Sequence, residues 1–356
     1  MTDLPFLSPA APDPAPDAAL GLPKILLHEH LDGGLRVATL HELLRERGAP
    51  SPAADEPGLA AWFVARAHAG SLVEYLKGFA LTITAMASPA ALERVAFEAA
   101  EDARAQGCVL AEFRIAPLLF EAHGLAGDAV VEALLAGLAR SPLKSGLIVC
   151  AMRQLPVTET VRAAELALRW FGRGVVGFDL AGPERGFPPG LHADALARVH
   201  EAGLPLTLHA GEADEAERVL EAGRLGARRI GHGVRLVDVL SDPVRAPLLD
   251  EVRNRGLHLE VCPTSNVHTG AAASIATHPI TALWRAGVSL SFHTDNTLMS
   301  CITLAGEARA LLAHTPLGLA DLVQMQLQAA AASFLPEAER DAAARQIHQW
   351  AVAQGV

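Results

Sequence analysis

Eight short runs of mainly apolar residues recur along this chain, and each of them turns polar towards its end. The runs span residues 24–33, 109–117, 146–153, 175–182, 205–212, 229–236, 257–266 and 288–296. Near-continuous apolar runs of this length are typical of parallel strands that are buried on both faces. Longer segments with helical start and stop signals separate the runs, so the sequence predicts alternating strands and helices.

This alternation predicts an α/β fold of the (β/α)8 TIM barrel type. A doubly wound open sheet is the competing architecture, but the chain has no GxGxxG loop and no Walker loop to support it. Residues 38–85 predict a mostly helical insertion after the first strand. We expect residues 1–22, which are rich in Pro and Ala, to form a disordered tail, and residues 23–356 to form a single domain.

Helix boundaries follow from capping residues and glycines. Ser88 followed by Pro89 predicts a helix start, and Gly107 predicts the end of that helix. The pair Asp242–Pro243 predicts the start of another helix, which Gly256 closes. Four more glycines stand where a helix C-terminus is expected: Gly172, Gly203, Gly223 and Gly287.

The composition narrows the class of protein. The formal net charge of −11 at pH 7 disfavours nucleic acid and anionic membranes as partners. The apolar stretches are too short to span a bilayer, and the start of the chain has no secretory signal pattern. The four cysteines lie far apart, as in a protein of a reducing compartment. We therefore expect a cytoplasmic protein with a small-molecule partner, and the oligomeric state stays open.

Four side chains at predicted strand ends have the chemistry of metal ligands. His28 and His30 are two residues apart on one strand, so both can face the barrel interior. His209 ends the fifth run and Asp295 ends the eighth. In a TIM barrel these ends meet at one mouth, and three nitrogens with one oxygen suit Zn²⁺, although another divalent metal could bind.

The predicted site holds a single metal ion. Related barrels bridge two metals through a modified lysine at the end of the fourth strand, but here that strand ends in "FDLAGPERG". The chain has only Lys24, Lys77 and Lys144, and none of them follows the polar end of a strand.

Two further residues suit acid–base chemistry at such a mouth. Glu212 stands three residues after His209, where burial would raise the pKa of its carboxyl group. His232 lies between two glycines in "IGHGV", which let another group approach closely. The alternatives are a salt-bridged rim glutamate and a histidine packed on a turn.

The motifs around these residues resemble the adenosine deaminase family, in the order of that family. The resemblance rests on "HEHLDGGLR", "VVGFDLAGPE", "LHAGE", "IGHGVRL", "CPTSN" and "HTDN", and it spans residues 24 to about 300. It implies hydrolytic deamination of adenosine, and of 2′-deoxyadenosine, to the inosine product and ammonia. The cytidine deaminase design is not implied, because the chain lacks the P-C-x-x-C zinc motif.

The resemblance also implies a role for each residue. His28, His30, His209 and Asp295 would bind one zinc ion, and Glu212 would protonate N1 of the purine while water attacks C6. His232 would orient and polarise the attacking water. For the substrate, Asp32 would hold the ribose 5′-hydroxyl and the backbone N–H of Gly182 would meet purine N3.

Two positions depart from the usual family pattern. The residue after Asp295 is usually a second acid that contacts purine N7, and here it is Asn296, a form that also resembles bacterial members of the family. Because N7 only accepts hydrogen bonds, an amide can donate to it at any pH. The second departure is His293, which we expect to be a hydrogen-bonded interior histidine, although a fifth metal contact is conceivable.

Two other functions remain open at this point. One is the same chemistry on another aminopurine, such as adenine or aminodeoxyfutalosine, and the other is a non-catalytic purine-binding relative. Asp32 favours a ribosyl substrate, and the complete ligand set with Glu212 favours catalysis.

Overall fold

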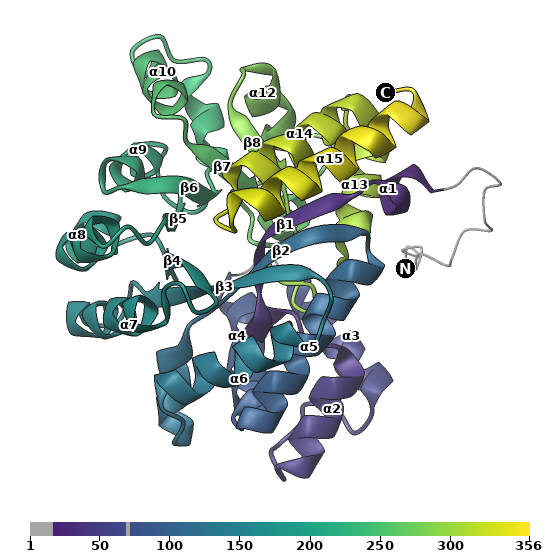
Figure 1. Ribbon diagram of the computed structural model, residues 1–356, viewed down its shortest axis with the longest axis vertical. Coiled ribbons are helices and arrows are strands. Elements are labelled where there is room, and N and C mark those ends of the chain that lie inside the picture. The colour runs from purple at the N-terminus through teal and green to yellow at the C-terminus, as the bar shows by residue number, and fades with distance from the viewer. Residues whose placement is uncertain (1–16, 69–71) are drawn as a thin grey trace.

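The computed structural model describes residues 17–68 and 72–356, and eight parallel strands form one sheet in chain order (Figure 1). This confirms the predicted TIM barrel, and each strand begins within two residues of the start of a predicted run, although several strands end before their runs do. The strands are β1 (Lys24–His30), β2 (Cys108–Ile115), β3 (Lys144–Met152), β4 (Val175–Ala181), β5 (Leu206–Ala210), β6 (Ala227–His232), β7 (His258–Val261) and β8 (Ser289–Phe292).

The sheet closes on itself just beyond the end of β8. Glu29 and Asp295 form a parallel β-bridge, in which the N–H of His30 donates to the carbonyl of Asp295 at 2.8 Å and the N–H of Asp295 donates to the carbonyl of His28 at 2.9 Å. Closure therefore runs through Asp295 and brings it beside the two histidines of β1.

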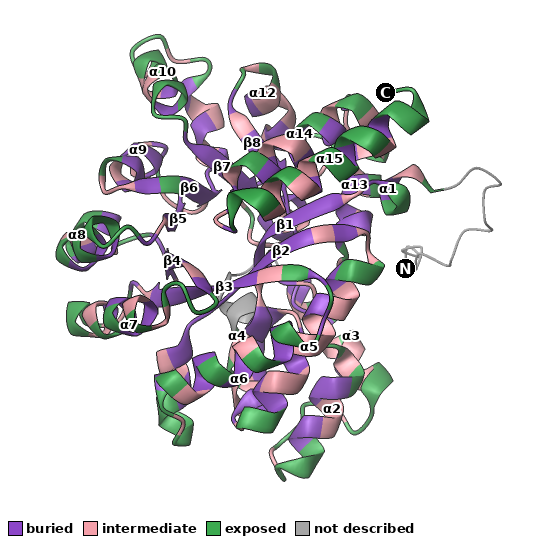
Figure 2. Cartoon of the chain, in the orientation of Figure 1, coloured by how far each residue is buried: buried purple, intermediate pink, exposed green. Residues whose placement is uncertain are grey.

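Helices surround the barrel, and in Figure 2 their outward faces are the exposed parts of the molecule while the central strands are buried. The α-helices are α1 (Ala18–Gly21), α2 (Val37–Glu46), α3 (Glu56–Ala67), α4 (Leu72–Met86), α5 (Pro89–Ala105), α6 (Gly127–Ala139), α7 (Val157–Trp170), α8 (Ala193–Glu201), α9 (Glu217–Arg224), α10 (Ala246–Asn254), α11 (Pro263–His268), α12 (Pro279–Arg285), α13 (Leu304–His314), α14 (Leu319–Ala332) and α15 (Glu337–Gln354). Short 3-10 helices follow several strands: η1 (Leu31–Gly33), η2 (Pro117–His123), η3 (Pro189–His192) and η4 (Val234–Val239). Helices α2, α3 and α4 make up the predicted insertion.

Most helix boundaries agree with the capping signals, and two do not. Ser88 accepts a hydrogen bond from the N–H of Ala91 and so caps α5. Helix α10 begins at Ala246, not at Pro243, because Asp242 instead forms a turn that accepts the N–H groups of Arg245 and Ala246. Gly223 lies inside the last turn of α9, not after it, because its missing side chain leaves room for Leu257.

Part of the predicted disordered tail is ordered in the structure. Residues 1–16 lie outside the described residues. Asp17 caps α1, and Ala19 and Leu22 are buried, so residues 17–22 pack against the barrel instead of forming a tail. Lys24, at the start of β1, stabilises this short helix because its ammonium group donates to the carbonyls of Ala19 and Leu22.

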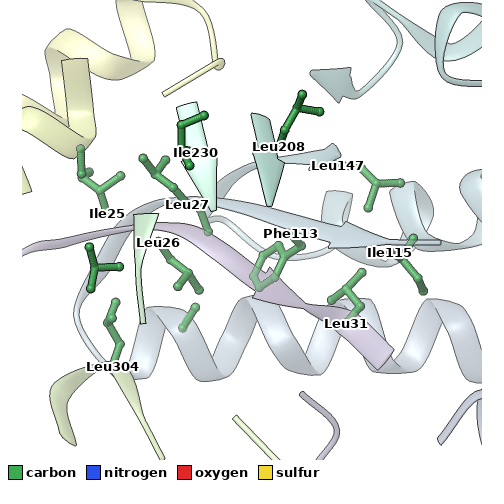
Figure 3. Close-up of a cluster of buried hydrophobic side chains, with 14 of the residues drawn as sticks. Ile25, Leu26, Leu27, Leu31, Phe113, Ile115, Leu147, Leu208, Ile230 and Leu304 are labelled. Atoms are coloured by element: carbon green, nitrogen blue, oxygen red, sulfur yellow. The ribbon is translucent and has the colours of Figure 1, made fainter. Parts of the chain in front are cut away.

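The apolar core lies mainly between the strands and the surrounding helices. Figure 3 shows part of it, where side chains of β1, β2, β3, β5 and β6 gather with Leu304 of α13. At this core, burial of apolar surface supplies the main favourable term in folding.

The barrel interior contains charged side chains, although the apolar runs of the sequence predict no charges there. Arg114 donates to Asp179 at 2.8 Å and to Glu260 at 2.6 Å, and Arg229 donates to Glu260 at 2.6 Å and contacts Glu112 at 2.7 Å. All five side chains are buried. We call this set (Glu112, Arg114, Asp179, Arg229 and Glu260) the floor network.

Phe334, after α14, packs against the floor network. The guanidinium of Arg229 lies 3.6 Å from the centre of its ring, and the N–H of Phe334 donates to Glu112. A Cβ at Gly177 would come within 2.7 Å of the same ring, so glycine at that position leaves room for the ring.

Within the described residues, no single helix is both long and apolar enough to cross a membrane. Taken together, η2 and α6 have the length and apolar composition of a membrane span, but they are sharply bent where they meet, and these are the only two criteria that they satisfy.

Candidate metal centre and active site

The four predicted ligands converge at the carboxyl-terminal mouth of the barrel. One ligand atom from each of His28, His30, His209 and Asp295 lies within 4.8 Å of all the others. Oδ1 of Asp295 is 3.2 Å from Nε2 of His28 and 3.5 Å from Nε2 of His30. The Nε2 atoms of His30 and His209 are 3.3 Å apart. Four donor atoms therefore point at one common location.

Hydrogen bonds to residues outside the ligand cluster orient three of these ligands. Nδ1 of His28 lies 2.8 Å from Glu260, and Nδ1 of His209 lies 3.0 Å from Asp179, so the floor network orients both rings. Ser265 donates to Oδ2 of Asp295 at 2.6 Å and leaves Oδ1 facing the histidines. Outer partners of this kind set the tautomer and orientation of metal-binding histidines.

The protonation states match what a cation requires. Burial lowers the pKa of His30 and of His209, so both imidazoles are neutral at pH 7. Burial acts to raise the pKa of Asp295, but the contact with His28 and the other nearby histidines hold that pKa well below the usual range. His30 and His209 therefore offer neutral nitrogens, and Asp295 offers a carboxylate.

Two of the site residues have a backbone conformation that is rare for residues with side chains. Asp295 has φ of 63° and His232 has φ of 66°, both in the left-handed region. Such conformations cost of order 1–3 kcal/mol and gather at functional sites.

Glu212 and His232 lie beside the ligand cluster. Oε2 of Glu212 is 3.7 Å from Nε2 of His232, and the rings of His232 and His28 are 5.0 Å apart between centres. Burial acts to lower the pKa of His232, but Glu212, Asp295 and Glu184 together raise it above its usual value. An acid and an imidazole thus face the same region as the ligands.

The remaining predicted residues line one cavity of about 280 Å³ with the site. Asp32 of η1, Gly182 after β4 and Asn296 after Asp295 form part of its wall. Phe79 and Ile83 of α4 lie over it, so the helical insertion covers the site. Gly182 has φ of 97°, and a Cβ there would come within 2.3 Å of Gln154.

Several buried polar atoms at the site have no hydrogen-bond partner. They are Nε2 of His28 in the ligand cluster, and Oδ1 of Asp32 and Oδ1 of Asn296 in the cavity wall. An unpaired buried polar group costs about 1–3 kcal/mol, so these atoms indicate a place for a polar ligand. Burial also raises the pKa of Asp32 to about 7.

His293 is an interior histidine, as expected, and lies away from the ligand cluster. Its Nδ1 accepts the N–H of Leu27 at 3.1 Å, so its proton is on Nε2, which lies 2.7 Å from Ser291. Ser291 in turn lies 2.7 Å from His258, whose other nitrogen contacts Ser289. The four side chains form one chain of hydrogen bonds, which is buried except at Ser289.

The sequence reasoning assigned no role to three residues that support Glu212. Glu184, buried, accepts the N–H groups of Gly211, Glu212 and Asp214, each at 3.0 Å. Asn266 and Thr269 each donate to Oε1 of Glu212 at 2.8 Å. Glu184 and Asn266 stand in the motifs "DLAGPE" and "CPTSN", so the signal was present, but the spacing alone could not indicate their partner.

Two larger cavities lie outside this site. One of about 500 Å³ lies between β1 and helices α2, α3 and α5 and is mainly apolar. Another of about 840 Å³ meets the site cavity at Glu212 and Thr269 and is lined by paired charges. The described residues that line these two cavities include no cluster of histidines, so we assign the candidate active site to the smaller cavity.

Comparisons with known proteins agree with this geometry. The model of the adenosine deaminase family matches residues 23–350. An adenosine deaminase from Mycobacterium ulcerans is 40% identical over 356 aligned residues, which cover 96% of this chain and 95% of that protein.

Two solved structures share the fold at lower identity. A zinc-bound amidohydrolase from Burkholderia ambifaria has a TM-score of 0.82 at 23% identity and covers 97% of both chains. An Arabidopsis protein, ADAL, in complex with IMP has a TM-score of 0.82 at 24% identity and covers 95% of this chain and 99% of that one. At these identities the likeness concerns the fold alone. The family model and the 40% identical relative, however, each span nearly the whole sequence, so the chain belongs to the adenosine deaminase family.

Proposed function

We propose that this protein catalyses the hydrolytic deamination of adenosine and 2′-deoxyadenosine to the inosine product and ammonia. The observation that carries the proposal is the convergence of three histidines and Asp295 beside Glu212, in a cavity of about 280 Å³. The name of the 40% identical relative supports the same reaction. We also propose a cytoplasmic location, which the four unpaired cysteines support.

We propose one zinc ion as the cofactor, held by His28, His30, His209 and Asp295. Three nitrogens and one oxygen match the ligand preference of Zn²⁺, and the unpaired Nε2 of His28 is the atom that a cation would satisfy. When bound, zinc supplies Lewis-acid chemistry that makes water a nucleophile at neutral pH. Because its partners on the floor network are already placed, the site needs little rearrangement to accept the ion.

Glu212 acts as the general acid in this proposal. When water attacks C6, the electron pair of the N1–C6 double bond moves to N1, which takes the proton of the Glu212 carboxyl. A positioned acid contributes roughly 10²–10⁴-fold to such a step. His232 orients the attacking water. One proton of that water passes to the amino group, the C6–N bond breaks as the C6=O double bond forms, and the proton of the C6 hydroxyl returns to Glu212, so that the inosine product and ammonia leave.

Three residues recognise the nucleoside. The backbone N–H of Gly182 donates to purine N3, and the amide of Asn296 donates to N7. The unpaired carboxyl oxygen of Asp32 accepts from the ribose 5′-hydroxyl. Asn296 packs directly on Gly33, whose missing side chain leaves room for the amide.

The charge of the cavity favours an unphosphorylated substrate. Its described lining contains Asp32, Glu184, Glu212 and Asp295, and none of the described lining residues is Lys or Arg. A 5′-phosphate near Asp32 would meet like charge without a cationic partner. Adenosine therefore suits the cavity better than AMP.

A steady-state assay of ammonia release tests the proposal. Zinc-loaded protein is offered adenosine, AMP, adenine and aminodeoxyfutalosine at equal concentrations. We expect the highest kcat/KM for adenosine, because it satisfies Asp32 without adding a phosphate. Equal values for adenine would refute the role of Asp32, and turnover of none of the four would leave a non-catalytic purine-binding protein.

The contact between Asn296 and N7 has its own test. The analogue 7-deazaadenosine lacks the N7 acceptor, so wild type should lose about tenfold in kcat/KM with it, the cost of one buried hydrogen bond. The variant Asn296→Ala should not discriminate between adenosine and the analogue. Equal wild-type rates on both substrates would show that Asn296 does not read N7.

A further inference from the structure

The two carboxyl oxygens of Glu212 have different surroundings. Oε1 accepts two hydrogen bonds of 2.8 Å, one from Nδ2 of Asn266 and one from Oγ1 of Thr269. Oε2 lies 3.7 Å from Nε2 of His232, beyond hydrogen-bond range. A neutral carboxyl has one O–H and one carbonyl oxygen, and an oxygen that faces two donors must be the carbonyl. The proton of neutral Glu212 therefore belongs on Oε2.

Asn266 also contacts the second catalytic side chain. Its Nδ2 lies 3.1 Å from Nδ1 of His232, close enough to donate its second hydrogen. If Nδ1 accepts, the proton of the neutral ring is on Nε2, the nitrogen that faces Oε2 of Glu212. A flipped amide would place the Asn266 oxygen against Oε1 of Glu212, so the bond to Glu212 sets the orientation of the amide.

The main chain of Glu212 is fixed independently. Glu184 accepts three N–H groups of the loop after β5, including that of Glu212 itself. With the backbone held on one side and Oε1 held on the other, the side chain of Glu212 has little freedom to turn. Asn266 and Thr269 lie at the end of α11 and just after it, so they reach Glu212 from a different strand–helix unit.

We propose that Asn266 and Thr269 are positioning residues that hold Oε1 of Glu212, so that Oε2 alone presents its proton to purine N1. The proposal rests on the proposed function, because it refines how Glu212 delivers that proton. Asn266 has the larger part, because it couples Glu212 to His232. Thr269 contributes a single hydrogen bond to Oε1. The other contact of its hydroxyl, with the carbonyl of Asn266, is longer at 3.5 Å and therefore weaker.

The test compares Thr269→Val, Thr269→Ser and Asn266→Ala with wild type, each as zinc-loaded full-length protein. Thr269→Val keeps the shape and removes the hydroxyl, so kcat for adenosine should fall about tenfold while KM changes by less than about twofold. Thr269→Ser should restore most of the rate. Asn266→Ala should lower kcat by about 10²–10³-fold, as does removal of a donor in other active sites.

A matched control makes the same Thr-to-Val substitution at a position away from Glu212. Thr277→Val removes an exposed hydroxyl that bonds only Ser274, so its kcat and KM should equal those of wild type. Zinc content and the thermal unfolding midpoint, measured for every variant, separate loss of positioning from loss of fold.

Three results would overturn the proposal: an unchanged kcat in Thr269→Val, a raised KM with unchanged kcat, or a Thr269→Ser variant as slow as Thr269→Val. If wild type releases no ammonia from adenosine, the proposed function has failed instead. The positioning role is then judged from crystal structures, in which Glu212 should keep one rotamer in wild type and lose it in Thr269→Val. One common rotamer in both proteins would refute the role.

Discussion

The floor network and the mouth of the barrel are both polar and buried, yet they differ in how their charges are balanced. In the floor network, Arg114 and Arg229 each lie between two carboxylates at 2.6–2.8 Å. At the mouth, carboxylates and histidines gather without a Lys or Arg among the described lining residues. The floor network supplies its own cations, whereas the mouth lacks one.

This difference separates structure from function within one fold. A buried carboxylate needs a counter-charge or strong donors, because the desolvation of an unpaired charge costs several kcal/mol. The floor network meets that need with arginine and thereby sets the orientation of His28 and His209. The mouth instead leaves donor atoms pointing at one location, which is the arrangement expected of a metal and substrate site.

The largest expected effect comes from removing a metal ligand. Asp295→Ala should lose zinc and reduce ammonia release to the rate in buffer, because the site then has one carboxylate fewer for the cation. The thermal unfolding midpoint of the metal-free form should stay close to that of metal-free wild type, since the floor network is intact. Full zinc occupancy in Asp295→Ala, measured by elemental analysis, would contradict this.

Next in size is the loss of the acid. Glu212→Gln keeps the shape of the side chain but cannot give up a proton, so kcat for adenosine should fall by roughly 10²–10⁴-fold. Zinc content should not change, because Glu212 is not among the four converging ligands. A variant that lost both zinc and activity would assign Glu212 to the metal instead.

Glu260 belongs to both regions, so its loss should affect both. Glu260→Gln removes the carboxylate shared by Arg114, Arg229 and His28. We expect the free energy of unfolding to fall by about 3–5 kcal/mol, as for other broken buried pairs, and zinc affinity to fall about 10–100-fold. Urea unfolding and zinc titration measure the two effects.

A surface carboxylate gives the matched control for Glu260. Glu121 pairs with Arg162 at the protein surface, and Glu121→Gln should change stability by less than about 1 kcal/mol. Equal changes in the free energy of unfolding for the two substitutions would show that the floor network stabilises the fold no more than a surface ion pair does.

A buried acid that lies outside both regions makes the stability of the fold depend on pH. Burial raises the pKa of Glu307 from 4.5 to about 8. The folded state then binds this proton more tightly than the unfolded state, so stability falls as pH rises from about 4.5 to 8, by at most about 1.4 kcal/mol per pH unit. Glu307→Gln, which keeps an acceptor for the N–H of Thr264, should flatten that slope.

A series of unfolding curves between pH 5 and pH 8 measures the slope for both proteins. Parallel pH profiles for wild type and Glu307→Gln would mean that Glu307 titrates alike in the folded and unfolded states.

The sequence predicted the barrel and the residues of the mouth because both leave local signals. A buried parallel strand is an apolar run, and a functional residue at its end is a polar interruption such as His209 or Asp295. The floor network left no such signal, because Arg114 and Glu260 each interrupt an apolar run in mid-strand, and pairing across the barrel interior depends on register.

The same reasoning explains the smaller errors. The helix expected at Pro243 begins at Ala246, because Asp242 stabilises a turn through its own backbone carbonyl. The glycine expected after α9 lies within it, since close packing on Leu257 and not chain reversal requires it. In both cases a tertiary contact or a turn outweighed the local helix signal.

The central claim is that the mouth lacks one cation, which is a single metal ion. A crystal structure of the zinc-loaded protein, with anomalous scattering recorded at the zinc edge, tests it most directly. We predict one zinc peak per chain at about 2.0–2.2 Å from Nε2 of His28, His30 and His209 and from a carboxyl oxygen of Asp295. Two peaks at the mouth, no peak there, or a peak bound by Glu212 or His232 would contradict the account.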